Sequence, residues 1–134
     1  MKLLASLAMC AALATTAFSE AISIQSPADG TTVQAGSSLT VEVIQHNSLS
    51  NFVEVGLAIG LGAPNIAPGI GPNILYNGPW DPQPQNNAVL QNFTVTIPSS
   101  TPTGLMSLNV AHFFMVGVDL FPTTGTVNIT LNVV

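Results

Sequence analysis

Hydrophobic and polar residues alternate along several short stretches of this chain, and the alternation predicts β-strands. In residues 38–45, Leu39, Val41 and Val43 fall on one face, because successive side chains of a strand point to opposite sides. The same period marks residues 52–59, 89–97, 105–116 and 125–133. The residues predicted to face the core there are Val53, Val55, Leu57, Ile59, Phe93, Val95, Ile97, Leu108, Val110, His112, Phe114, Val127, Ile129, Leu131 and Val133.

Shorter strands are predicted at residues 22–25 and 74–76, with an edge piece at 31–33, and glycine and proline separate them. No stretch shows helical periodicity. About seven short strands at regular spacing indicate an all-β fold, namely a small antiparallel β-sandwich of immunoglobulin-like architecture. A small barrel is the alternative. Because the Cys–Trp–Cys pattern of antibody domains is absent, the prediction concerns architecture alone.

The first residues have the pattern of a secretory signal peptide. Lys2 gives a positive start, residues 3–13 are apolar, and the small residues around Ser19 match a signal peptidase site. We expect cleavage after Ser19, or alternatively after Ala21, so that residues 1–19 are the signal and 20–134 form one domain. The apolar run is shorter than the ~20 residues of a spanning helix. The mature protein is therefore expected to be secreted and extracellular, without a membrane anchor.

Charge excludes several classes of partner. The chain has one Lys or Arg, which is Lys2, and six Asp or Glu, so cleavage leaves a domain without Lys or Arg. Nucleic-acid binding relies on these cations, as does electrostatic attachment to anionic lipid. The only cysteine, Cys10, also lies in the signal, so we expect no disulfide in the mature domain.

The residues show no pattern of a reaction centre. His46 and His112 are the only histidines, and neither belongs to a nucleophile motif. His112 is interpreted as a hydrogen-bonded core residue, and a hydrolase that uses it is the least favoured function. The acids are scattered, and Glu42 and Glu54 are predicted on exposed strand faces, so neither a metal site nor paired catalytic carboxylates is indicated. We expect no cofactor, no metal and no enzymatic activity.

One loop is a candidate contact surface. It contains the only tyrosine and the only tryptophan, Tyr76 and Trp80, followed by Asp81. Aromatic residues are enriched at binding hot spots, so these three residues are the candidate contact loop. The alternative, which we slightly prefer, is a loop that folds back and buries its rings.

Two triplets match the N-glycosylation sequon, beginning at Asn92 and Asn128. The alternation of their strands places each Asn and its Thr on the outward face. Both asparagines are therefore candidate sites in a secreted glycoprotein.

Phrases along most of the mature chain resemble those of a known family. They are ISIQSPADGTTVQAGSSLTVEV at 22–43, LYNGPWDPQ at 75–83, QNFTVTIPSS at 91–100, LNVAHFFMVG at 108–117 and the C-terminal NITLNVV. Together they resemble the fungal necrosis-inducing secreted protein family. The resemblance implies a β-sandwich virulence effector that binds plant receptor-associated kinases and damps immune signalling, and it supplies no catalytic residue.

The opening phrase, residues 26–41, also resembles the cell-wall β-glucan assembly domain of Ser/Thr-rich anchored fungal proteins. The Ser/Thr-rich stalk and the anchor signal of that group are missing. The expected function is therefore a secreted, non-catalytic fungal effector that binds a host immune-signalling protein. A binding or structural module for cell-wall glycan is the alternative.

Overall fold

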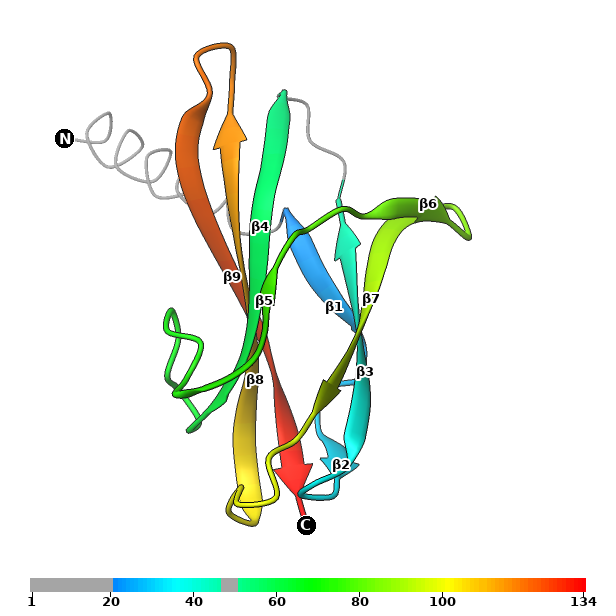
Figure 1. The fold of residues 1–134 in the computed structure, drawn as a ribbon, viewed down its shortest axis with the longest axis vertical. Helices are drawn as coiled ribbons and strands as arrows, with labels where there is room; N and C mark the ends of the chain where they lie inside the picture. Colours follow the sequence, from blue (N-terminus) through cyan, green and yellow to red (C-terminus); the bar gives the residue numbers. More distant parts are fainter. Residues whose placement is uncertain (1–20, 47–50) are drawn as a thin grey trace, which may run out of the picture.

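The computed structural model describes residues 21–46 and 51–134, and the predicted signal peptide lies outside these ranges. Within them the chain forms nine strands in two sheets that pack face to face (Figure 1). The strands are β1 (Ile22–Ser26), β2 (Thr31–Val33), β3 (Ser38–Gln45), β4 (Phe52–Gly62), β5 (Asn73–Gly78), β6 (Gln83–Gln85), β7 (Ala88–Thr96), β8 (Gly104–Val116) and β9 (Phe121–Val133). The described part of the chain has no helix that could cross a membrane.

The strand order is that of an immunoglobulin-like sandwich. One sheet runs β1-β3-β7-β6 and the other runs β2-β9-β8-β4-β5. Neighbours pair antiparallel except β2, which runs parallel to β9. If β3 is lettered B, β4 C, β5 C′, β6 D, β7 E, β8 F and β9 G, the second sheet contains the GFCC′ order of variable-type domains. The predicted architecture is confirmed, and the count exceeds seven because β2 and β6 are three-residue strands at the sheet edges.

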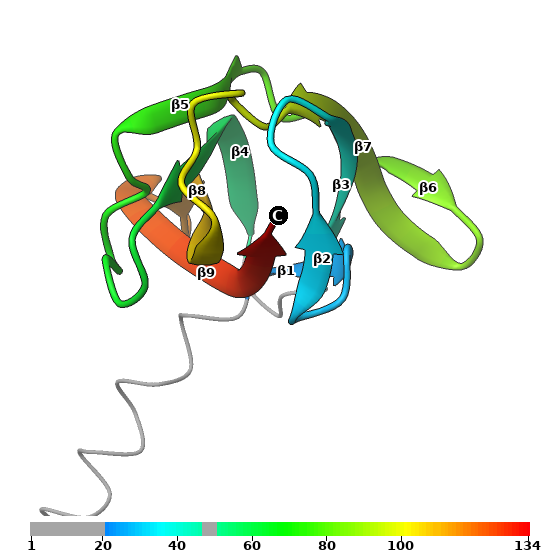
Figure 2. The same cartoon turned by 90° about the horizontal axis from the view of Figure 1, so that it is seen from below.

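The two sheets face each other, as Figure 2 shows in end view. The core lies between them and is built from alternate residues of each strand. Most residues predicted to face inward are buried there, including Val41, Val43, Phe93, Val95, Ile97, Leu108, Val110, Leu131 and Val133. Full burial of one such side chain contributes about 1.5–3 kcal/mol. Packing of this kind can stabilise the domain without a disulfide.

Strand β4 departs from the predicted alternation at its first half. The pattern predicts Val53 and Val55 in the core, yet each is 47% exposed. The cause is a β-bulge between Glu54 and Gly56 in the pairing with β8. One extra residue in a strand reverses which side chains face inward before it. The prediction is therefore wrong for both valines, and also for Glu54, whose side chain turns inward instead of lying exposed.

The connection between β4 and β5, residues 63–72, folds back over the outer face of the five-stranded sheet (Figures 1 and 2). Asn109 Nδ2 donates to the Ile70 carbonyl at 3.3 Å, and Thr126 Oγ1 donates to the Pro68 carbonyl at 3.4 Å. Gly60 permits the close approach, because a side chain there would collide with the Ile70 carbonyl. We call residues 63–72 the covering loop.

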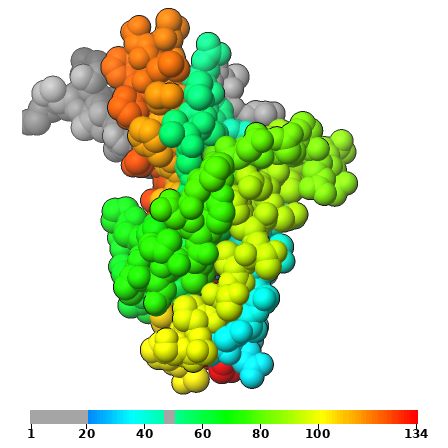
Figure 3. Space-filling model, viewed as in Figure 1, coloured from blue at the N-terminus to red at the C-terminus, as the bar shows by residue number. Residues whose placement is uncertain are grey.

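The β8–β9 hairpin extends past the opposite sheet. β8 and β9 have 13 residues each, whereas β3 has 8 and β7 has 9. The hairpin and the start of β4 therefore project at one end of the molecule (Figures 1 and 3). Side chains at this end have one sheet beside them instead of two, which leaves several apolar residues exposed.

Candidate functional site

The candidate contact loop folds its rings into the protein. Trp80 is 5% exposed and stacks on Phe93, with ring centroids 6.0 Å apart. Tyr76 is half-buried, packs 4.6 Å from the same ring, and donates its hydroxyl to the Pro79 carbonyl at 2.6 Å. Of the three residues singled out in the sequence, Asp81 alone is exposed. The structure therefore matches the interpretation of a loop that buries its rings.

His112 lies in the core beside Glu54. The imidazole is buried, at 3% exposure of the residue, and its Nδ1 is 2.9 and 3.1 Å from the two carboxylate oxygens of Glu54. An ionised carboxylate can only accept, so the ring nitrogen donates. Gln45 Nε2 adds a second donor to the same carboxylate at 3.3 Å. His112 is thus the hydrogen-bonded core histidine that its strand position predicts, and Glu54 is a partner that the sequence pattern does not reveal.

Neighbouring residues fix the His112 ring in place. It stacks on Phe114, with centroids 4.4 Å apart. Gly125 in β9 is the cross-strand partner of His112 in β8. A Cβ atom added to that glycine would lie 2.8 Å from the ring Nε2. The imidazole side chain is therefore almost fully enclosed. Among the described residues, no group of three or more His, Cys, Asp or Glu side chains could hold a metal ion.

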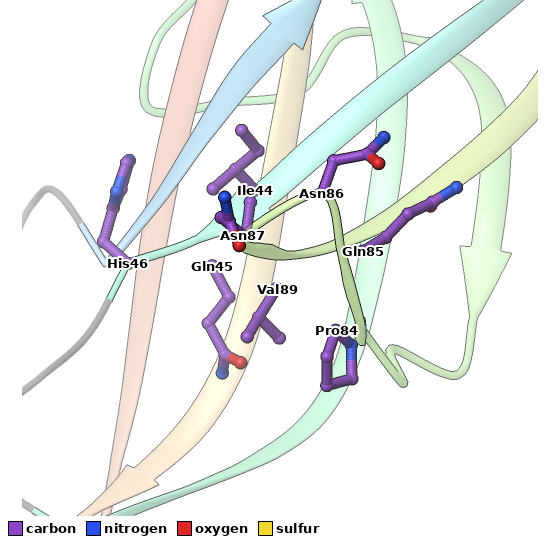
Figure 4. Close-up of a pocket in the computed structure, with 9 residues that line it drawn as sticks. Ile44, Gln45, His46, Pro84, Gln85, Asn86, Asn87 and Val89 are labelled. Carbon is purple, nitrogen blue, oxygen red and sulfur yellow. The ribbon is translucent and has the colours of Figure 1, made fainter.

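The second histidine borders a polar groove. His46 directly follows β3, is exposed, and has its Nε2 2.8 Å from Ser23 Oγ. The groove has a volume of about 530 Å³ and lies between the end of β3 and the β6–β7 hairpin. Its lining includes the amides of Gln45, Gln85, Asn86 and Asn87 (Figure 4). Figure 4 shows these side chains pointing in different directions, so they do not converge on one reacting atom.

The two sequon asparagines lie on different sheets. Asn92 is exposed on β7, and its sequon threonine, Thr94, is exposed as well. Asn128 is exposed on β9 beside the covering loop, and the hydroxyl-bearing Thr130 is half-buried. Both asparagines are placed where a glycan could be attached, and their modification stays a prediction.

An apolar surface lies at the projecting end of the five-stranded sheet. Phe113 is 39% exposed on the outer face of β8, next to the exposed Val53 and Val55 of β4. The surface continues into the β8–β9 turn, where Val118 is 92% exposed. We call this surface the hairpin face, and its residues are Val53, Val55, Phe113, Met115, Val118 and Leu120.

Sequence reasoning misses the hairpin face because it assigns the β4 valines to the core. One signal could have revealed it. Residues 111, 113 and 115 of the predicted strand are Ala, Phe and Met, so the strand is apolar on both faces at this point. A half-buried strand of an antiparallel sheet is expected to be polar on its outer face. A strand without that polar face indicates a second contact surface.

Fold and surface together define a class: a small immunoglobulin-like β-sandwich with an exposed apolar surface at one end. Within that class, the chain belongs to the Nis1 family, whose family model matches residues 17–132. No curated protein matches the chain in sequence. The family match agrees with the resemblance seen in the sequence and indicates an effector-like protein.

Proposed function

We propose that this protein is a secreted fungal effector that acts by binding a host immune-signalling protein, possessing no catalytic activity of its own. The observation that carries the proposal is the Nis1 family match over residues 17–132, which spans nearly the whole domain. The sequence resemblance supplies the class of partner, a plant receptor-associated kinase. The signal-like residues 1–19 supply the route out of the cell.

The arrangement of polar side chains supports a binding role. The two histidines lie in separate environments, with His112 enclosed against Glu54 and His46 exposed beside Ser23. A hydrolytic triad needs an accessible base with an orienting acid next to a nucleophile. His112 is hydrogen-bonded to the carboxylate of Glu54 but is enclosed. His46 is hydrogen-bonded to the Ser23 hydroxyl, and no carboxylate among the described residues is bonded to it. Neither histidine therefore has both an orienting acid and a nucleophile.

Two measurements on purified mature domain test the proposal. The first is the immune burst of plant tissue treated with the domain, which should be reduced relative to tissue treated with heat-denatured domain. The second is a pull-down with a purified receptor-associated kinase as the prey, which should retain the kinase. If several host tissues show neither a reduced burst nor a retained kinase, the effector role is refuted.

A second candidate function is binding of cell-wall glycan, and the amide-lined groove favours it. Amide side chains both donate and accept hydrogen bonds, which suits the hydroxyl groups of a sugar. Gln45, Asn86 and Asn87 all line the groove. Co-sedimentation with insoluble β-glucan tests this candidate, and replacing Asn86 and Asn87 with alanine should abolish it. A domain that stays in the supernatant rules it out.

A further inference from the structure

The outer face of the five-stranded sheet has two unlike halves. On β8 the outward residues alternate with the core residues Leu108 and Val110, so Ser107 and Asn109 point away from the core. Both are nevertheless buried, because the covering loop lies on them. Asn109 donates to the Ile70 carbonyl of that loop and to the Ser107 carbonyl. The covered half of this face is therefore polar and hydrogen-bonded.

The other half has the opposite character. Farther along β8 the outward residues are Ala111, Phe113 and Met115, and the covering loop reaches this half at Thr126, the β9 partner of Ala111, which donates to the Pro68 carbonyl. Val53 is paired with Met115 on the adjacent strand and is exposed. The apolar half of this face is thus exposed to solvent, whereas the polar half is shielded from it. Contiguous exposed apolar surface of this kind marks interaction sites.

A shallow hollow lies at the edge of the hairpin face. Its floor consists of small residues, Gly56, Ala58 and Ala111, with Phe113 and Val55 on its sides. Its volume is about 270 Å³, below the range of about 300–1,000 Å³ that is typical of small-molecule sites. The hollow is large enough for one bulky side chain. Binding hot spots are commonly such pockets, filled by an aromatic or aliphatic anchor of the partner.

Charge narrows the choice of partner. Residues 20–134 contain no Lys or Arg. Asp119, in the turn between β8 and β9, is an exposed acid beside Val118 and Leu120. A second copy of this chain would bring like charges together, which disfavours self-pairing. A partner with Lys or Arg around an apolar centre would be complementary.

Neither sequon asparagine lies within the hairpin face. Asn92 is on β7, in the opposite sheet. Asn128 is four residues from Thr124, the β9 partner of Phe113, which is about 13 Å along a strand. Neither asparagine lines the hollow.

We propose that the hairpin face is the partner-binding surface, and that it takes an aromatic or bulky aliphatic side chain of a protein segment into the hollow, with a Lys or Arg of that segment toward Asp119. This inference rests on the proposed binding function and gives that function a location. Phe113 and the small residue Ala111 define the anchor site. Asp119 supplies the charge that favours a basic segment.

The experiment uses a phage-displayed library of random peptides as the probe, selected on the mature domain. Enriched peptides should carry an aromatic or large aliphatic residue and a Lys or Arg. Their affinity should fall at least about tenfold with Phe113→Ser, the size of effect expected for a hot-spot residue. Ala111→Leu should have a similar effect, because it fills the hollow while keeping the surface apolar. Peptides that adhere non-specifically to apolar surface would still bind the Ala111→Leu variant.

Leu105→Ser is the matched control. Leu105 is an outward residue of the same strand, 60% exposed, and eight positions from Phe113. This variant should bind the peptides as the parent does, and circular dichroism should show all three variants folded. Three results would overturn the proposal: no enrichment, enriched peptides without basic residues, or peptides that bind Phe113→Ser and Leu105→Ser equally.

Two further measurements exclude other occupants. Sedimentation should show a monomer, and self-association that is lost in Phe113→Ser would assign the surface to a second copy instead. Flotation with phosphatidylcholine vesicles should leave the domain unbound, and binding there would assign the surface to a membrane. The immune burst of tissue treated with Phe113→Ser separates this inference from the proposed function. If Phe113→Ser still reduces the immune burst, the effector role stands and the location is wrong.

Discussion

Glu54 accepts a hydrogen bond from the Nδ1 of His112 at 2.9 Å, and the two residues lie 58 positions apart in the chain. The contact exists because a bulge in β4 turns Glu54 toward the core, while the regular alternation of β8 turns His112 toward it. Both side chains are almost fully buried. A carboxylate buried among apolar residues must have such partners, since an unpaired buried charge is costly.

Replacing Glu54 with leucine should destabilise the domain. The change leaves the Nδ1–H of His112 buried without an acceptor, which costs about 1–3 kcal/mol. Urea unfolding measures the loss. Combining Glu54→Leu with His112→Leu should recover part of it, because no unpaired polar group then remains. Glu42→Leu, on the outward face of β3, is the control and should change stability by less than about 0.5 kcal/mol. Equal stability of Glu54→Leu and parent would contradict the account.

Gly125→Ala tests the space around the histidine ring. The new Cβ would lie 2.8 Å from His112 Nε2, so either the ring or strand β9 must shift. Overpacking of this kind costs about 1–3 kcal/mol. Gly56→Ala is the matched change, because the nearest atom to its Cβ, the Gly78 carbonyl oxygen, is at 3.4 Å. In thermal unfolding, the midpoint temperature of Gly125→Ala should be well below that of Gly56→Ala. The reverse order would show that the ring does not pack against β9.

Trp80 should behave as a core residue. It is the only tryptophan, so its fluorescence reports on this one site. We expect emission at short wavelength and little quenching by acrylamide in the folded domain. Trp80→Ala should cost about 3–5 kcal/mol of stability. Ready quenching, together with an unchanged stability of the alanine variant, would instead favour an exposed contact residue.

The secreted protein should start at Glu20 or Ile22. After enzymatic removal of any N-glycan, mass spectrometry of protein from culture medium should give one of these two masses. The denatured protein should also survive trypsin intact, because residues 20–134 contain no Lys or Arg. A mass that retains Lys2, or fragments after trypsin, would refute the predicted signal peptide.

Much of the fold could be predicted because period-two alternation is a local property of the chain. Residues 92–97 show it without interruption, and their inward residues Phe93, Val95 and Ile97 are buried. Strand β6 escaped prediction because three exposed residues containing Pro84 carry no alternation. The bulge at Val55 escaped because it depends on pairing with β8, which a local pattern does not contain.

The candidate surface was harder to predict than the fold. Tyr76 and Trp80 are candidate contact residues in the sequence because they are its only tyrosine and tryptophan, yet both pack against Phe93. Aromatic residues serve cores and interfaces equally well, so residue type alone could not decide between them. The hairpin face depends on where the covering loop ends and on how far β8 and β9 outreach the other sheet. Both are tertiary features.

The most direct test of the account compares three proteins in one assay: the parent mature domain, Phe113→Ser and Leu105→Ser. Each is applied at equal concentration to plant tissue, and the immune burst is recorded. The account predicts that the parent and Leu105→Ser reduce the burst and that Phe113→Ser does not. A burst that the folded parent domain leaves unchanged in several hosts would contradict the central claim.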